Sequence, residues 1–174
     1  WDAQKGALEH TLTGHIDWVH SAVFSPDGNK IVTASYDNTA KIWNAQTGAE
    51  LNRLTGHTSD VWAAAFSPNE NKIVTASLDD TAKIWNAHTG ALEYTLTGHT
   101  GTVYSAAFSP DENKIVTASD DRTAKIWNAQ TGTELHTLTG HTAWVVSAVF
   151  SPDGNKIVTA SSDNTAKIWN AQTG

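Results

Sequence analysis

The sequence contains no cysteine and no methionine, and none of its hydrophobic runs is long. Without cysteine, the chain can form no disulfide, no thiolate metal site and no cysteine nucleophile. No apolar run approaches the roughly 18 residues that a membrane-spanning helix needs, and the first residues show no signal-peptide pattern. We therefore expect a globular protein of the cytoplasm that has no membrane partner.

Positive charge is also scarce, because 11 Lys and Arg residues stand against 18 Asp and Glu residues, which gives a net charge of −7. Eight of the 11 cations occupy two positions of a recurring unit, such as Lys30 and Lys41 in its first copy, instead of forming one patch. Nucleic-acid binding depends on Lys and Arg side chains that cluster on one face. We therefore expect no nucleic-acid partner.

The recurring unit is 42 residues long, because the pair Gly-His returns at that spacing four times, beginning at Gly14. Aligned at this period, the four copies agree at 26 of 42 positions, which is typical of a repeat protein. We predict a single four-repeat unit over residues 1–174, with repeats at residues 7–48, 49–90, 91–132 and 133–174. Residues 1–6, WDAQKG, are similar to WNAQTG at 169–174, and we interpret them as the loop end of a preceding repeat.

Each repeat contains four short apolar or β-branched runs separated by turn residues, the pattern of an all-β chain. In the first repeat these runs are residues 8–13, 18–24, 30–35 and 39–43. Pro26 and Gly28 mark a turn between the second run and the third. Apolar side chains in residues 30–35 fall on both faces of the expected strand, so we predict sheets that stack on one another.

One polar set of histidine, threonine, aspartate and tryptophan recurs complete in all four repeats. The sets are His15, Thr33, Asp37 and Trp43; His57, Thr75, Asp79 and Trp85; His99, Thr117, Asp121 and Trp127; and His141, Thr159, Asp163 and Trp169. A hydroxyl, an imidazole and a carboxylate are the parts of a hydrolase triad. A triad, however, needs one copy beside one pocket, whereas this set occurs in every repeat.

The tryptophan accounts for the other three residues of each set without catalysis. A buried indole N–H needs an acceptor, and a chain of hydrogen bonds from Trp43 through Thr33 and His15 to Asp37 satisfies every group. Ser35 lies on the same strand face as Thr33, so the identity of the hydroxyl stays open between them. We interpret the sets as structural networks, and we predict that the chain is not an enzyme and has no catalytic residue, metal site or cofactor.

Gly-His, a Ser-x-Asp-x-Thr turn and a terminal Trp-Asp or Trp-Asn at a spacing of 42 residues resemble the WD-repeat β-propeller family, and the resemblance covers the whole chain. Only Trp1-Asp2 has the dipeptide that names the family, and the other four copies, beginning with Trp43-Asn44, are Trp-Asn. The resemblance implies blades of four antiparallel strands around a central channel. It also implies a non-enzymatic scaffold that binds proteins or peptides.

The blades of this family are offset from the sequence repeats, so each repeat would supply the outer strand of one blade and the three inner strands of the next. The run at 8–13 then lacks a partner strand, and the blade that ends at Trp169 lacks an outer strand. Four blades in one ring turn by about 90° at each interface, against about 51° for the family's usual seven. We therefore predict a homodimer in which two chains close an eight-bladed ring, each first strand completing the other chain's last blade. The alternative is a monomeric four-bladed ring.

Positions that differ among the repeats are the candidates for partner binding, since the shared positions build the scaffold. The resemblance places these positions on the top face and at the mouth of the channel. Aromatic and arginine side chains, which carry much of the energy of protein interfaces, are frequent among the candidates: Trp18, His20, Tyr36, Asp60, Trp62, Tyr104, Arg122 and Trp144. The same variation would also arise at positions where neither the fold nor a partner requires a particular side chain.

Two other functions remain open. A lectin-like binder of multivalent ligands would present one pocket in every blade, and the differing candidate positions disfavour it. The near-identity of the repeats also suits an amplified or engineered array with no function beyond assembly. Methionine is missing even from the first position, where Trp1 stands, so we expect a segment of a longer chain or a processed one.

Overall fold

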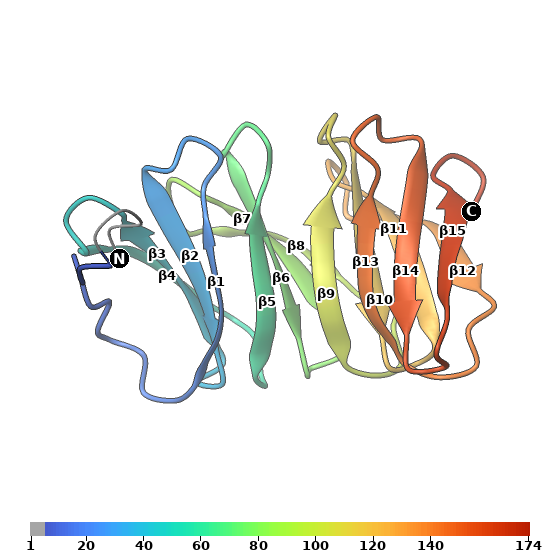
Figure 1. The fold of residues 1–174 in the computed structure, drawn as a ribbon, viewed down its shortest axis with the longest axis horizontal. Helices are drawn as coiled ribbons and strands as arrows, with labels where there is room; N and C mark the ends of the chain where they lie inside the picture. Colours follow the sequence, from blue (N-terminus) through green and yellow to red (C-terminus); the bar gives the residue numbers. More distant parts are fainter. Residues whose placement is uncertain (1–5) are drawn as a thin grey trace.

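The computed structural model describes residues 6–174, so Trp1-Asp2 and the residues up to Lys5 lie outside the described part. The described residues form four antiparallel sheets, of which three have four strands and the last has three (Figure 1). This arrangement confirms the prediction of an all-β chain built from blade-like sheets. No helix in this part of the chain is long and apolar enough to cross a membrane.

Each sheet is called a blade here and is numbered in chain order. Blade 1 contains β1 (Val19–Phe24), β2 (Lys30–Ser35), β3 (Thr39–Asn44) and β4 (Glu50–Thr55). Blade 2 contains β5 (Val61–Phe66), β6 (Lys72–Ser77), β7 (Ala82–Asn86) and β8 (Leu92–Leu96). Blade 3 contains β9 (Val103–Phe108), β10 (Lys114–Ser119), β11 (Thr123–Asn128) and β12 (Glu134–Thr139). Blade 4 contains β13 (Val145–Phe150), β14 (Lys156–Ser161) and β15 (Ala166–Asn170).

The second strand of each blade is hydrogen-bonded on both sides. In blade 1, Ile31 of β2 lies opposite Phe24 of β1 and opposite Trp43 of β3. The residues from Val32 to Ser35 are buried, because neighbouring parts of the molecule cover both faces of this strand. That double coverage explains why the run is apolar at odd and even positions alike.

The hydrophobic cores lie between neighbouring blades. At the first boundary, Val32, Ile42 and Leu54 of blade 1 pack with Phe66 and Ile73 of blade 2, and equivalent residues form the next two cores. These five side chains are at most 8% exposed, and full burial of one such side chain contributes about 1.5–3 kcal/mol. Stacking of one blade on the next is therefore a main source of stability.

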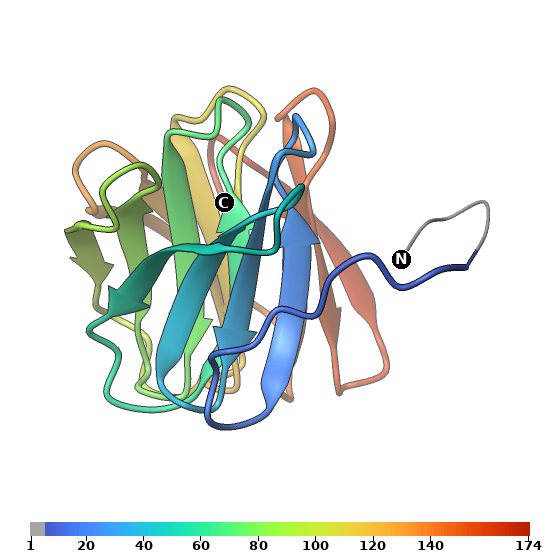
Figure 2. The same ribbon diagram turned by 90° about the vertical axis from the view of Figure 1, so that its left-hand side faces the viewer.

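The two end faces of this row of blades pack on no neighbouring blade. Phe24 of blade 1 is 63% exposed, whereas its counterpart Phe66 in blade 2 is 8% exposed. At the other end, Ile168 of blade 4 is 73% exposed, whereas its counterpart Ile126 in blade 3 is fully buried. Figure 1 places blade 1 and blade 4 at opposite ends of the row, and Figure 2 looks onto the blade 1 end. The described chain thus forms an open row of four blades.

The prediction of a strand at residues 8–13 is wrong for this structure, since residues 6–18 form no strand and β1 begins at Val19. The equivalent segments of the later repeats are β4, β8 and β12, which each pair with the third strand of the blade before. The predicted offset between repeats and blades is therefore confirmed. For residues 8–13, the described chain contains no such preceding blade, and a strand without a neighbour has no ladder to join.

Candidate functional site

The four polar sets each form one continuous chain of hydrogen bonds. In blade 2, the indole N–H of Trp85 donates to the Thr75 hydroxyl (2.9 Å), which donates to Nε2 of His57 (2.7 Å). Nδ1 of the same ring donates to Oδ2 of Asp79 (2.8 Å). The other three blades repeat this chain with every distance between 2.7 and 2.9 Å. A neutral histidine that carries its proton on Nδ1 gives every donor of the chain an acceptor.

The hydroxyl of this chain in blade 1 belongs to Thr33, which resolves the choice that the sequence left open. Ser35 instead donates to the backbone carbonyl of Asp17 (3.2 Å) and accepts from the backbone N–H of Asp37 (3.1 Å). Thr33 is 3% exposed and Thr75 is fully buried, so a substrate has no access to these hydroxyls. The sets therefore join strands to loops and present no accessible nucleophile.

In blade 2, the surroundings of the polar set keep the aspartate charged and the histidine neutral. Burial raises the pKa of Asp79, but hydrogen bonds from His57 and Thr81 outweigh it and hold the pKa below its usual value. Burial lowers the pKa of His57, and the Asp79 carboxylate opposes that effect only in part. In blade 1, burial is likewise outweighed by hydrogen bonds from Thr39 and His15, which lower the pKa of Asp37 to about 2.

Six of the eight candidate binding residues form a continuous row of rings, which we call the aromatic band: Trp18, His20, Tyr36, Trp62, Tyr104 and Trp144. The band begins in blade 1, where Trp18 stacks on Tyr36 with ring centroids 5.9 Å apart. It crosses every blade boundary through contacts between rings, and Trp62 contacts both His20 and Tyr36 at the first boundary. The centroid distances are 4.1 Å for His20–Trp62, 5.4 Å for Trp62–Tyr104 and 6.2 Å for Tyr104–Trp144.

The first strands of the blades position the band, because β1, β5, β9 and β13 are successive neighbours in the row. His20, Trp62 and Tyr104 are the second residues of β1, β5 and β9, so equivalent side chains meet across the boundaries. Val146 has this position in β13, and the band continues instead through Trp144, just before the strand. The rings of four blades therefore form one surface.

Two hollows adjoin the band. The first has a volume of about 430 Å³ and is lined by His20, Trp62, Tyr104, Trp144, Val146 and Ser162. The second has a volume of about 600 Å³ and is lined by Asp120, Arg122, Thr142, Ala143, Trp144 and Ser162. Trp144 and Ser162 line both, so the hollows meet. The candidates from the sequence omit Asp120, Val146 and Ser162, although each stands at a position that varies among the repeats.

Asp60 and Arg122 are the two candidates outside the band. Arg122 lines the second hollow and has a left-handed backbone conformation (φ 72°). Asp60 precedes β5, where its backbone carbonyl accepts a hydrogen bond from the N–H of Leu78 (3.0 Å), and it lines neither hollow. Within the band, the indole N–H of Trp62 is enclosed and has no acceptor among residues 6–174. The same residues hold no group of three His, Asp or Glu side chains that could bind a metal ion.

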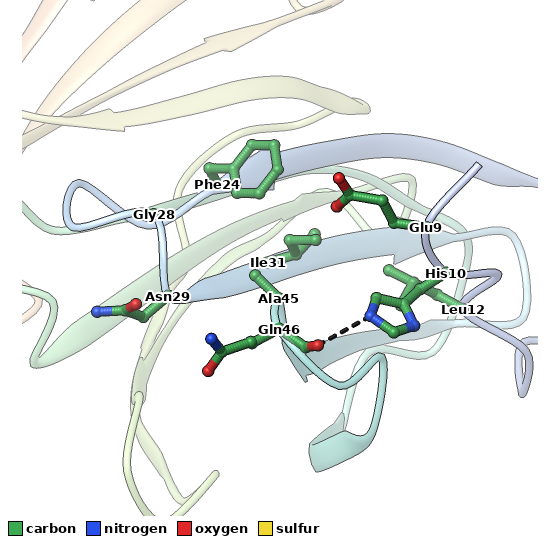
Figure 3. Close-up of a pocket in the computed structure, with 9 residues that line it drawn as sticks. All are labelled: Glu9, His10, Leu12, Phe24, Gly28, Asn29, Ile31, Ala45 and Gln46. Atoms are coloured by element: carbon green, nitrogen blue, oxygen red, sulfur yellow. Dashed lines mark hydrogen bonds between the residues drawn. The ribbon is translucent and has the colours of Figure 1, made fainter. Parts of the chain in front are cut away.

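A third hollow, of about 380 Å³, opens on the uncovered face of blade 1 (Figure 3). It is lined by Glu9, His10, Leu12, Phe24, Gly28, Asn29, Ile31, Ala45 and Gln46. Nε2 of His10 donates to the backbone carbonyl of Gln46 (2.8 Å), as the Asn52 amide donates to the carbonyl of His88 (3.1 Å) one repeat later. The N-terminal segment thus contacts blade 1 as β4 contacts blade 2, although it forms no ladder.

The blades, their networks and their repeat length together define one class of protein. The model for the "WD domain, G-beta repeat" family (WD40) matches residues 6–44, 48–86, 90–128 and 132–170. These matches cover most of the chain, and the chain belongs to this family. WD-repeat domains generally act as non-enzymatic scaffolds for protein interactions.

Two curated proteins illustrate the likeness at the level of a single repeat. The chain is 38% identical over 42 residues to apoptotic protease-activating factor 1 of Rattus norvegicus, and equally to that of Mus musculus. Each match covers 24% of this chain and 3% of the relative. The match thus spans only a small part of the curated relatives, and the likeness concerns the repeat.

Proposed function

We propose that the chain is a non-enzymatic scaffold that binds a protein or peptide through the aromatic band, and that it closes its propeller with a second copy of itself. The observation that carries the binding role is the band, which joins rings of all four blades. In a propeller, the first strands of the blades surround the central channel, and these strands position the band. The top face of the channel is therefore the proposed docking surface.

Exposure of the large rings supports this role. Trp18 is 76% exposed and Trp144 is 55% exposed, and grouped apolar side chains on a surface mark interaction sites. The fold does not depend on these rings, because Asp60 and Thr102 occupy the equivalent position in blades 2 and 3. Tryptophan and tyrosine dominate the binding energy of many interfaces. Packing within the chain does not explain why tryptophan stands at these two positions, whereas contact with a partner does.

An affinity capture with matched variants tests the binding role. The immobilised chain would capture partners from a cell extract, and a captured partner would then be purified and titrated against each variant. We expect Trp144→Ala to weaken binding at least about tenfold. Leu135→Ala is the control, since Leu135 lies in the outer strand β12 and is 40% exposed. Equal affinity for the two variants would count against the aromatic band.

The end faces support closure by a second copy. The face of blade 1 that holds Phe24 corresponds to the blade 2 face that holds Phe66 and packs on blade 1. The face of blade 4 that holds Ile168 corresponds to the blade 3 face that holds Ile126 and packs on blade 4. In a dimer, the free face of blade 4 in one copy would pack on the free face of blade 1 in the other copy. This contact would resemble the contacts between neighbouring blades within one chain. In a two-fold dimer, both contacts form and no sheet edge is left open.

The N-terminal segment has the sequence that this closure needs. Residues 8–12 are Leu-Glu-His-Thr-Leu, and β8 is Leu-Glu-Tyr-Thr-Leu. β8 pairs with β7, whose sequence Ala-Lys-Ile-Trp-Asn is also that of β15. We therefore expect the segment of one copy to pair with β15 of the other as β8 pairs with β7.

An ion pair in blade 2 predicts an ion pair across the closed ring. Nζ of Lys72 lies 2.8 Å from a carboxylate oxygen of Glu93. The residues at the equivalent positions are Lys156 in blade 4 and Glu9 in the N-terminal segment. Closure by a second copy would place Lys156 of one chain beside Glu9 of the other, where each would gain a partner of opposite charge.

Ile168→Glu tests closure without disturbing the single chain, because Ile168 is 73% exposed there and a closed ring would bury it. We expect this variant to sediment as a single chain at concentrations where the parent sediments as a dimer. Leu135→Glu is the matched control, since an outer-strand position stays exposed in either state. Equal masses for the two variants would count against closure through the blade 4 face.

The alternatives predict other outcomes. A lectin-like binder needs the same hollow in every blade, but the strand position of His20 holds Trp62, Tyr104 and Val146 in the other blades. A monomeric four-bladed ring predicts that Ile168→Glu leaves the mass unchanged and lowers stability. An array with no function beyond assembly predicts that Trp144→Ala changes no interaction.

A further inference from the structure

The second hollow beside the aromatic band is lined by a carboxylate, Asp120, and by the ring of Trp144. We propose that this hollow binds a guanidinium or ammonium group of a basic peptide, held between Asp120 and the neighbouring ring of Trp144. The inference rests on the proposed binding role of the band and adds the chemistry of the partner.

Two departures from the repeat pattern in blade 3 place the carboxylate in the hollow. The position of Asp120 is Tyr36, Leu78 or Ser162 in the other repeats. Gly101 occupies a position that has a side chain in every other repeat. A methyl group on Gly101 would overlap Oδ1 of Asp120. The missing side chain at Gly101 therefore makes room for the carboxylate.

Asp120 is poor in positive neighbours. The ion pairs among residues 6–174 all involve other carboxylates. Burial raises the pKa of Asp120, and the nearby negative charges of Asp80 and Asp121 raise it further, while hydrogen bonds from Thr102 oppose these effects only in part. Arg122 lines the same hollow but is exposed to water and beyond ion-pair distance. A half-buried carboxylate among like charges is stabilised by a cation, so the hollow favours a positive ligand.

The rings beside Asp120 favour the same ligand. Burial raises the pKa of Tyr104, and the charge of Asp120 adds to that effect. The Tyr104 ring lies beside the Trp144 ring in the band, with centroids 6.2 Å apart. Trp144 lines both hollows, so a group in the second hollow is adjacent to the band. Cations are attracted to the faces of tryptophan and tyrosine rings. The net charge of −7 also favours the approach of a basic peptide over an acidic one.

Fluorescence anisotropy with three labelled peptides tests the inference. The peptides have equal length and one Gly-Ser backbone, and they carry arginine, glutamine or glutamate at the same positions. We expect the parent chain to bind the arginine peptide most tightly, and Asp120→Asn to weaken that binding about tenfold, as for loss of a charged hydrogen bond. Arg122→Asn removes a repelling charge from the same hollow and should raise the affinity for the arginine peptide.

The matched control is Asp111→Asn, which removes the same charge from the same blade. Asp111 lies in the turn between β9 and β10, at the other end of the blade, and Asn69 already occupies its position in blade 2. Equal effects of Asp120→Asn and Asp111→Asn would overturn the inference, as would a preference for the glutamate peptide that Arg122→Asn abolishes.

Failure of the inference and failure of the proposed function give different results. If Trp144→Ala weakens peptide binding and Asp120→Asn does not, the band binds peptides and the charge assignment is wrong. If Trp144→Ala changes the binding of none of the three peptides, while each still binds, the aromatic surface itself is not the docking site.

Discussion

Interior and terminal blade faces carry the same residue types in different surroundings. Phe66 is 8% exposed where blade 2 packs on blade 1, and Phe24 is 63% exposed where blade 1 ends the row. Both strands keep the same pairing, since Phe24 lies opposite Ile31 and Phe66 lies opposite Ile73. The strand ladder of a blade thus forms without a neighbour on that face, whereas burial of its core depends on one. The neighbour, rather than the sequence of the blade, decides how much each face contributes to stability.

Truncation of a buried side chain on an interior face should cost the most stability. Phe66→Ala should lower the free energy of unfolding by about 3–5 kcal/mol. Phe24→Ala removes the equivalent exposed ring, and in dilute single chains it should cost less than about 1 kcal/mol. Urea unfolding of both variants measures the difference. At concentrations that favour the dimer, the two losses should converge, and equal losses at every concentration would contradict the comparison.

A polar network in an interior blade should be more sensitive than the same network at the end of the row. Thr117→Val leaves the indole N–H of Trp127 without its acceptor, and Trp127 is 1% exposed. We expect a loss of about 2–3 kcal/mol. Thr159→Val does the same to Trp169, which is half-buried and reachable by water, so a loss of about 1 kcal/mol is expected. Urea unfolding measures both losses of stability. A larger loss for Thr159→Val than for Thr117→Val would show that exposure of the tryptophan does not determine the loss.

Acid should weaken the interior network of blade 2 in two steps. The folded state lowers the pKa of His57 from 6.5, so the unfolded chain binds a proton that the folded chain resists, and stability declines as pH falls below about 6.5. The pKa of Asp79 is also lowered, from 3.8, so its contribution is complete above that pH and is lost as pH falls further. Urea midpoints across pH measure both steps. His57→Gln should remove the first step, and an unchanged profile in this variant would contradict the assignment.

The smallest effect concerns a backbone position that differs between blades 3 and 4. Arg122 has a φ of 72°, while Asn38 and Asn164 hold the equivalent position at 66° and 67°. Asparagine adopts this left-handed conformation more readily than arginine. Arg122→Asn should therefore raise the free energy of unfolding by about 0.5–1 kcal/mol, and Asn164→Arg should lower it by a similar amount. Thermal unfolding checks both, and a loss of stability in Arg122→Asn would contradict this reading.

The sequence is sufficient to predict the networks because every hydrogen-bond donor of a polar set finds an acceptor within the same set. Trp43 needs an acceptor, Thr33 and His15 can each accept and donate, and Asp37 ends the chain, so chemistry alone orders the residues. The choice between Thr33 and Ser35 needed the structure, since both lie on one face of β2 and differ in what lies beside them.

The sequence was not sufficient where contacts cross blade boundaries. The pattern of residues 8–13 predicts a strand, but it does not reveal whether a neighbouring strand is present. Tyr104 and Trp144 stand at different positions of the repeat, and only the stacking of blades 3 and 4 brings them together. The contact of Asp120 with Gly101 also depends on the fold, because the two residues lie in separate loops of blade 3.

Sedimentation equilibrium of the unmodified chain measures whether two copies close one ring. One chain has a mass of 18.7 kDa. If the uncovered end faces close on a second copy, the mass should be about twice this value at micromolar concentration and should fall toward the single-chain value on dilution. A mass of 18.7 kDa throughout the micromolar range would contradict closure by a second copy.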